Sequence, residues 1–533
     1  MPDRTRNKIM LFLSSLLLSL LYLVSVATAY LDGKIIDLAL AGDLVGVSKT
    51  ALFNAGILVL RFAFFVVSIL IHMKYVSGGT LTLKHNLMKN ILSRPLRIFR
   101  LKNNAYYLNL MGADVDMYRQ DRLNCLPYLP SEGIVALASA AALYFINPWL
   151  CLAGVVMAVI PILLSNLIQK STQKRRKAYS EANEAYTSTL KETIEGYEAI
   201  RMENASVPAL TRFDQASAVQ QRAFTANKFT MGVGHNAMWF VGSALQLSGI
   251  VLGGYFIVKG QLTAGLLASA TYYFAGIIDG TNNFIEYLIN IRSTKPVAKK
   301  LLAEAEAPCP KESGGELAAE PLIEYEHVSF GFGERELYHD FSHAFLPGGC
   351  YAVTGESGGG KSTLIKLLLK YYDDYTGEIR LAGQNIRGLC EEEIYGLVSV
   401  VSQTAFLFNA SLYENITLYS GEPKEDSEEY RALLRDVNLT ALAARVGSAP
   451  LGDFGDNISG GERQRICIAR AMRRKPRVMI FDEPTTGLDP ENVAIINEFI
   501  FRHKDITRIV ISHDWSREYL DRFDGVIRLG EPG

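Results

Sequence analysis

Long apolar segments fill much of the first half of the chain, and each contains few charged residues. A helix needs about 20 such residues to cross the hydrocarbon core of a bilayer. The chain turns between the third and fourth segments at Asn147-Pro148, and between the fifth and sixth at Lys259-Gly260-Gln261, so each pair is predicted to form a helical hairpin. The pattern predicts six membrane spans near residues 9–31, 51–73, 131–147, 149–168, 231–258 and 263–288.

The first apolar segment allows two interpretations. Ala27-Thr28-Ala29 resembles a signal-peptidase site, which would make residues 9–31 a cleaved leader. The apolar run is longer than the roughly 7–15 residues usual in the core of a signal peptide, and it approaches the length of a span. We therefore favour a retained first membrane helix.

Basic residues cluster between the second and third spans and between the fourth and fifth. The positive-inside rule places both of these segments, the N-terminus and everything after the sixth span in the cytoplasm. Apolar residues recur there at helical spacing, so we expect the membrane helices to continue beyond the bilayer. Contact with lipid headgroups explains the basic clusters better than a substrate role. They include Lys84, Lys89, Arg94, Arg97, Arg100 and Lys102, and then Lys170, Lys174, Arg175, Arg176 and Lys177.

Polar residues inside the spans are candidates for lining a translocation cavity. Arg61 lies near the middle of the second span, where a charge that faces lipid is costly. Asp279, Asn282, Asn283 and Glu286 recur at spacings of three and four along the sixth span, which places them on one helix face. The alternative is that Arg61 pairs inside the protein and that Glu286 lies at the cytoplasmic boundary.

The pattern changes after residue 302. Residues 303–321 are rich in Pro, Gly and charged residues and are predicted to be a linker, and short apolar strands alternate with helices from residue 322 to 533. The formal charge of −1, from 54 Lys+Arg and 55 Asp+Glu, gives no reason to expect nucleic acid as a partner. The six scattered cysteines indicate neither a disulfide framework nor a zinc site.

A phosphate-binding loop follows the apolar strand Cys350–Val353. The stretch GESGGGKST fits G-x-x-x-x-G-K-[ST], whose small residues let backbone N–H groups surround phosphates at a helix N-terminus. Lys361 is expected to reach the β- and γ-phosphates, and Ser362 to offer a hydroxyl to Mg²⁺. The loop comprises Gly355, Glu356, Ser357, Gly358, Gly359, Gly360, Lys361, Ser362 and Thr363.

Two further apolar strands end in polar residues. Val478–Phe481 leads into Asp482-Glu483, where Asp482 can hold the metal of a P-loop ATPase and Glu483 can polarise the attacking water. Ile509–Ile511 leads into Ser512-His513, which places an imidazole at the same edge of a parallel sheet.

A second anion-binding helix start lies at Ser459, Gly460, Gly461 and Glu462. Its small residues leave backbone N–H groups unobstructed at the positive end of a helix. One nucleotide has no evident use for two such loops on one small domain, but a dimer does.

Together these motifs resemble the ABC transporter family, specifically half-transporters with the exporter-type fold, and the resemblance covers essentially the whole chain. Gln403 matches the family's glutamine loop, ISGGE from Ile458 the signature sequence, VMIFDEPT the Walker B strand, Asp489 the D-loop and His513 the switch histidine. Phe332 stands where the family's adenine-stacking aromatic is found, although a core Phe would also explain it.

The resemblance implies an all-α six-helix transmembrane domain, residues 1–302, followed by an α/β P-loop ABC ATPase domain with a mainly parallel sheet, residues 322–533. It implies ATP and Mg²⁺ as cofactors, with Ser362, Gln403 and Asp482 at the metal and Glu483 and His513 as catalytic residues. ATP would be sandwiched between the phosphate loop of one half-transporter and the signature of a second, in a homodimer or a heterodimer. The expected location is the plasma or inner membrane, with the ATPase domain in the cytoplasm.

The chain departs from the family in two places. Glu462 replaces the usual glutamine of the signature, and Gly452-Asp453-Phe454-Gly455 stands where exporters commonly carry G-E-R-G. By analogy, the helices that couple the two domains are expected near Asn109–Asp116 and Met202–Arg212, docking near Gln403.

ATP-driven export of a small molecule, lipid or peptide is the leading hypothesis for function. Import, of a siderophore for example, is an alternative within the same fold. An ATP-gated membrane sensor or regulator is an alternative from a different class.

Overall fold

The computed structural model describes residues 4–102, 104–305, 322–333, 335–356, 358–452, 455–512 and 516–529. The chain divides into two compact units. The helical unit comprises Met1–Asn90 and Asn104–Ala307, and the α/β unit comprises Ile91–Asn103 and Pro308–Gly533.

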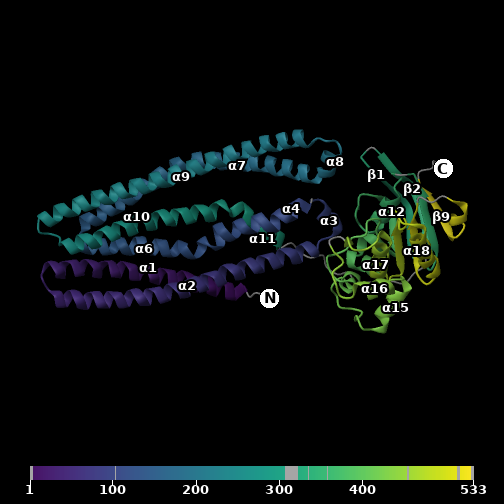
Figure 1. Ribbon diagram of the computed structural model, residues 1–533, viewed down its shortest axis with the longest axis horizontal. Coiled ribbons are helices and arrows are strands. Elements are labelled where there is room, and N and C mark those ends of the chain that lie inside the picture. Colours follow the sequence, from purple (N-terminus) through teal and green to yellow (C-terminus); the bar gives the residue numbers. More distant parts are fainter. Residues whose placement is uncertain are drawn as a thin grey trace. The chain divides into compact units, whose positions relative to one another are not determined.

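Long helices build the helical unit, and Figure 1 shows them running side by side. Helix α7 pairs with α9, whereas α1, α6 and α10 pack on one another. The long helices are α1 (Arg4–Leu40), α2 (Leu44–Leu92), α6 (Cys125–Ile146), α7 (Pro148–Glu195), α9 (Ser206–Val258) and α10 (Ala264–Ser293). Shorter ones are α4 (Asn104–Asn109), η1 (Leu110–Asp114), α5 (Val115–Tyr118), η2 (Arg119–Leu123), α8 (Tyr197–Met202) and α11 (Lys295–Ala305).

Several of these helices are much longer than a bilayer requires. Helix α9 has 53 residues, which at 1.5 Å per residue is about 80 Å, against a hydrocarbon core of about 30 Å. Each expected span falls on one long helix to within one residue. In the part of the chain that the structure describes, four stretches are long and apolar enough to cross a membrane: Thr5–Leu40, Leu44–Leu92, Tyr106–Ile146 and Phe240–Val258. The number of six spans therefore stays a prediction.

Small residues let α1 and α10 approach closely. A Cβ placed on Gly265 would lie 2.0 Å from the carbonyl oxygen of Gly33, so only glycine fits at this crossing. Ser269 donates a hydrogen bond across the interface to the Ala29 carbonyl at 2.9 Å. The Asp37 carboxylate accepts from the Gly265 N–H at 2.7 Å, which satisfies one of the free N–H groups at the start of α10. Backbone contact thus fixes the two helices together.

The α/β unit contains an antiparallel and a parallel sheet. The antiparallel sheet has the order β2-β1-β4-β5, and the parallel sheet the order β6-β7-β8-β3-β9. Both are enclosed by apolar clusters of buried residues. The strands are β1 (Ile323–Phe332), β2 (Arg335–Phe345), β3 (Cys350–Gly355), β4 (Thr376–Leu381), β5 (Gln384–Asn385), β6 (Val398–Val401), β7 (Val478–Asp482), β8 (Thr507–Ile511) and β9 (Gly525–Leu529). The predicted parallel-sheet core is confirmed.

Helices cover the sheets and connect their strands. They are α12 (Lys361–Leu368), η3 (Ile386–Gly388), α13 (Glu391–Leu397), α14 (Leu412–Thr417), α15 (Glu428–Asp436), α16 (Thr440–Val446), α17 (Gly460–Met472), α18 (Pro490–Arg502) and α19 (Arg517–Leu520). Residues 303–305 of the expected linker are helical, as the end of α11, and residues 306–321 lie outside the described residues.

A short segment after α2 belongs to the α/β unit rather than to the helical unit. It carries α3 (Leu96–Arg100), whose first N–H, that of Leu96, donates to both carboxylate oxygens of Glu391 at 3.0 Å. The Arg97 guanidinium pairs with Asp373. The coupling segment expected at Asn109–Asp116 belongs to the helical unit, and its docking stays a prediction.

Candidate nucleotide site

The phosphate loop closes around its own lysine. Strand β3 is buried along its whole length and ends at Gly355, whose φ is 148° and where a Cβ would lie 2.2 Å from the Leu529 carbonyl oxygen. Gly360, with φ 93°, leads into α12. Lys361 is 6% exposed, and its ammonium donates to the carbonyl oxygens of Gly355 at 2.7 Å and Glu356 at 3.0 Å. The loop is therefore preorganised around a buried positive charge.

Contacts from the antiparallel sheet hold the rest of the loop. The Tyr338 hydroxyl donates to the Gly360 carbonyl, and the Arg335 guanidinium donates to the Gly358 carbonyl at 3.1 Å. Ser357 lies outside the described residues. The predicted aromatic, Phe332, ends β1 half-exposed and packs edge-on against Tyr372, with 5.3 Å between ring centroids. Its exposed face leaves room for stacking.

Acidic residues lie at the carboxyl end of β7. The Ser362 hydroxyl donates to the Asp482 carboxylate at 3.2 Å, so two of the three predicted metal ligands already meet. Burial raises the pKa of Asp482, and the hydrogen bond from Ser362 opposes that rise. Next to it, Glu483 adopts φ 51° and accepts a hydrogen bond from the Gln403 amide at 2.8 Å. Side chains from the ends of three parallel strands, β3, β6 and β7, thus converge at one sheet edge.

The signature residues cap their own helix. The Ser459 hydroxyl accepts from the Glu462 N–H at 3.2 Å, and the Glu462 carboxylate accepts from the Ser459 N–H at 2.8 Å. This reciprocal arrangement is a capping box. The Arg445 guanidinium donates to both oxygens of Glu462, at 2.9 and 3.0 Å. The acidic replacement in the signature is therefore neutralised inside the chain.

Burial and hydrogen bonding shift the pKa of Glu462 in opposite directions. Burial alone would raise the pKa of this carboxyl, but the hydrogen bonds from Ser459 and Arg445 outweigh it and hold the pKa below the ordinary value. The Glu462 carboxylate is thus stabilised by contacts with Ser459 and Arg445. Ser459 and Gly460, just before it, remain exposed.

Asn492, which was not predicted from the sequence, connects the signature to the predicted D-loop residue. The Asp489 carboxylate caps α18 by accepting from the Asn492 N–H at 2.9 Å and from its side-chain amide at 2.6 Å. The Arg465 guanidinium donates to the Asn492 side-chain oxygen. A Cβ on Gly461 would come within 2.2 Å of that side chain, which explains a glycine here. Asn492 stands three positions after Asp489, and this spacing, which is typical of a helix N-cap, was the signal available in the sequence.

Some predicted residues fall outside this description. His513, the predicted switch histidine, and Asp453-Phe454, the departure from G-E-R-G, lie outside the described residues. The roles assigned to them from the sequence stay predictions.

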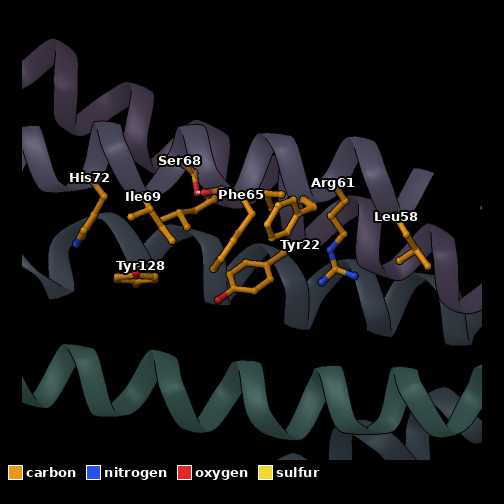
Figure 2. Close-up of a pocket in the computed structure, with 11 residues that line it drawn as sticks. Tyr22, Leu58, Arg61, Phe65, Ser68, Ile69, His72 and Tyr128 are labelled. Atoms are coloured by element: carbon orange, nitrogen blue, oxygen red, sulfur yellow. Dashed lines mark hydrogen bonds between the residues drawn. The ribbon is translucent and has the colours of Figure 1, made fainter. Parts of the chain in front are cut away.

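The polar residues of the membrane spans do not form one group. Arg61 lines a cavity of about 350 Å³ between α1, α2 and α6, and Figure 2 shows its side chain beside Tyr22, with Tyr128 near His72 at the other end. Asp279, Asn282, Asn283 and Glu286 do not line this cavity. Asp279 and Glu286 are exposed on α10, and Asn282 and Asn283 are half-buried. The expectation that all five residues line a translocation cavity stays a prediction.

A buried acid in this region was missed by the sequence analysis. Glu132 on α6 is 4% exposed and accepts a hydrogen bond from the Tyr22 hydroxyl at 3.0 Å. Asn283 is a further side-chain partner of Glu132. A single acid at the start of the apolar segment 131–147 was the signal that would have found it.

Family models match both parts of the chain. The ABC transporter transmembrane region matches residues 11–280, which is about half of the chain, and the ABC transporter model matches residues 338–486.

Individual relatives agree with the family models. The chain is 29% identical to the mycobactin import ATP-binding/permease protein IrtB of Mycolicibacterium smegmatis, over 73% of this chain and 69% of the relative. It is 27% identical to an ATP-dependent lipid A-core flippase of Francisella tularensis, over 81% and 72%. A solved bacterial Atm1-family ABC exporter with ATP bound has the same fold, with a TM-score of 0.82, 20% identity and coverage of 99% and 95%. The chain belongs to the ABC transporter family, as a multi-pass half-transporter in which fused membrane and ATPase regions couple ATP hydrolysis to transport.

Proposed function

We propose that two half-transporters bind ATP between them, with Gly355–Thr363 of one chain and Ser459–Glu462 of the other on opposite sides of the nucleotide. The observation that supports this most strongly is the exposed, preformed signature loop. Its hydrogen bonds in the described part of the chain stay within its own helical turn and the adjoining Arg445. An outward-facing helix N-terminus of this kind suits a phosphate from a second chain.

Each residue of the nucleotide site then has a chemical role. Lys361 binds the β- and γ-phosphates, and Phe332 stacks on adenine. Ser362 and Asp482 supply the oxygen donors that Mg²⁺ prefers, with Gln403 beside them, and the ion would neutralise phosphate charge. Glu483 polarises the attacking water, with His513 as the second catalytic residue. Asp489 holds the loop before α18 in place.

A mixed-dimer experiment tests the shared site. Lys361→Ala disables the phosphate loop and Ser459→Arg disables the signature, so each variant alone forms dimers without an intact site. When differently tagged chains carrying one change each are co-expressed and purified through both tags, one of the two shared sites is intact. We expect about half of the wild-type ATPase activity from the mixed dimer. No recovery would contradict a shared site, and failure of the two tags to copurify would contradict a homodimer.

We further propose that the ATPase region lies in the cytoplasm and that ATP binding switches the membrane region between inward- and outward-facing states, for export of a small molecule, lipid or peptide. Import is the second candidate, and its support is the similarity to a protein whose name describes mycobactin import. Inside-out vesicles that hold the chain distinguish them. ATP-dependent uptake supports export, ATP-dependent release supports import, and ATP hydrolysis without either supports a membrane sensor.

A further inference from the structure

The cavity between α1, α2 and α6 has the size of a ligand site. Its volume is about 350 Å³, which falls within the range of about 300–1,000 Å³ typical of small-molecule pockets. Its walls are mainly apolar, with Leu18 and Leu21 from α1 facing Phe62 and Phe65 from α2. Arg61 and His72 lie at positions along α2 that are about 16 Å apart at 1.5 Å per residue, and Figure 2 shows both reaching toward the space beside Tyr22 and Tyr128. The pocket is therefore elongated and lined by aromatic and aliphatic groups.

Most polar groups in the wall are already engaged within the chain. The Ser68 hydroxyl donates to the Phe65 carbonyl at 2.8 Å, and the His72 Nδ1 lies 3.4 Å from the Ser14 hydroxyl. The Tyr22 hydroxyl donates to Glu132, an acid that does not itself line the pocket. These groups orient the wall and leave little hydrogen-bonding capacity for a ligand.

Arg61 differs from them. Its guanidinium carries five N–H donors and no acceptor. No hydrogen bond or ion pair joins it to any residue in the described ranges. The side chain is half-buried at the middle of the apolar segment 51–73, where an unpaired guanidinium is costly. An anion beside Arg61 would offset that cost.

We propose that this pocket binds an amphipathic anion, with a carboxylate or phosphate group at Arg61 and an apolar body along Leu21, Phe62 and Phe65. Arg61 binds the anion through paired N–H donors, which suit both groups. The same chemistry occurs in an acidic phospholipid of the bilayer and in a soluble amphiphile. This proposal rests on the transport function, because it assigns the chemical class of the cargo. It concerns only the pocket between α1, α2 and α6.

A binding measurement on the full-length protein tests this assignment. The protein is placed in nanodiscs of uncharged phosphatidylcholine, and two probes with the same tail are titrated: dodecyl phosphate and dodecyltrimethylammonium. We expect dodecyl phosphate to bind more tightly. Arg61→Gln should weaken its binding on the order of tenfold, Arg61→Lys should retain it, and Lys74→Gln, an exposed cation on the same helix outside the pocket, should leave it unchanged.

A second variant keeps the test decisive if Arg61→Gln fails to fold. Leu58 lines the pocket one helical turn before Arg61, so Leu58→Glu supplies an internal acid at the i, i+3 spacing that pairs side chains on a helix. It should abolish the preference for dodecyl phosphate. Equal binding of both probes to the wild type, or unchanged binding of dodecyl phosphate in both variants, would overturn the proposal.

Two further readouts identify the source of the anion and separate this proposal from the transport function. If bilayer lipid occupies the pocket, phosphatidylglycerol in the nanodisc competes with dodecyl phosphate and copurifies with the wild type but not with Arg61→Gln; if it does not compete, a soluble amphiphile is the ligand. ATPase activity and vesicle transport are measured on the same samples. In the wild type, equal binding of the two probes together with intact transport rejects the pocket alone, whereas preference for dodecyl phosphate without transport rejects the transport function alone.

Discussion

The phosphate loop and the membrane pocket each hold a basic side chain in surroundings of low polarity, but only one is satisfied by its own chain. Lys361 donates to two backbone carbonyls of the loop that surrounds it. Arg61 has no such acceptor among the described residues. The difference reflects what each site is built from. A loop exposes backbone carbonyls that can accept hydrogen bonds from a cation, whereas the backbone carbonyls of membrane helices already accept hydrogen bonds within the helix. We therefore expect the nucleotide site to be fixed before its ligand arrives and the membrane pocket to be completed by its ligand.

Among single substitutions in the nucleotide site, a change of Glu483 should have the largest effect on ATP turnover. Glu483→Gln keeps the size of the side chain and its place beside Gln403 but removes the carboxylate proposed to polarise water. We expect turnover to fall by a factor on the order of 10² to 10⁴, with ATP binding retained. ATPase assays and ATP-binding measurements on the purified protein check this. The control is Glu428→Gln, an exposed acid paired with Arg435; retained hydrolysis in Glu483→Gln would contradict the role.

The next prediction concerns a contact inside the α/β unit, between Glu391 and the segment that follows α2. Glu391→Ala removes both acceptors of the Leu96 N–H. We expect vesicle transport to fall about tenfold, the effect of roughly 1.4 kcal/mol, while basal ATPase stays within about twofold because no nucleotide contact changes. The matched control is Glu392→Ala, which removes an exposed acid from the same first helical turn. Equal losses in both variants would show that the Leu96 contact has no special part in coupling.

The contrast between the two sites also explains what could be predicted from the sequence. Gly355 and Gly360 adopt positive φ values within a few residues of Lys361, so the geometry of the loop is local and its motif predicts it. The place of Arg61 depends on how α2 packs on α1 and α6, which no local pattern specifies. For the same reason the burial of Glu132 was not predicted. The helix at Leu96–Arg100 was not predicted because five residues leave almost no periodic signal.

A smaller effect is expected at the signature, where preorganisation depends on one ion pair. Arg445→Leu leaves the charge of Glu462 uncompensated next to the loop proposed to meet a phosphate. We expect the KM for ATP to rise about threefold, consistent with the roughly 0.2–1 kcal/mol of a partly exposed pair, with kcat less affected. The matched control is Arg435→Leu, because Arg435 and Arg445 are each 57% exposed and each pairs with a glutamate. If both variants behave alike, Arg445 only stabilises the fold.

The smallest effect is the pH dependence of the same ion pair. Because the pKa of Glu462 is lowered in the folded protein, its contribution to stability is fully present above the ordinary glutamate value of about 4.3 and is lost as the pH falls through the lower folded value. Glu462→Gln keeps the cap but has no carboxyl to titrate. We expect the wild type to exceed Glu462→Gln in thermal stability by less than about 1 kcal/mol at pH 7, with the gap closing below pH of about 4. If the stability difference between the wild type and Glu462→Gln instead widened at low pH, the charge on Glu462 would destabilise the fold despite its pairing with Arg445. The signature would then be less preorganised than its hydrogen bonds indicate.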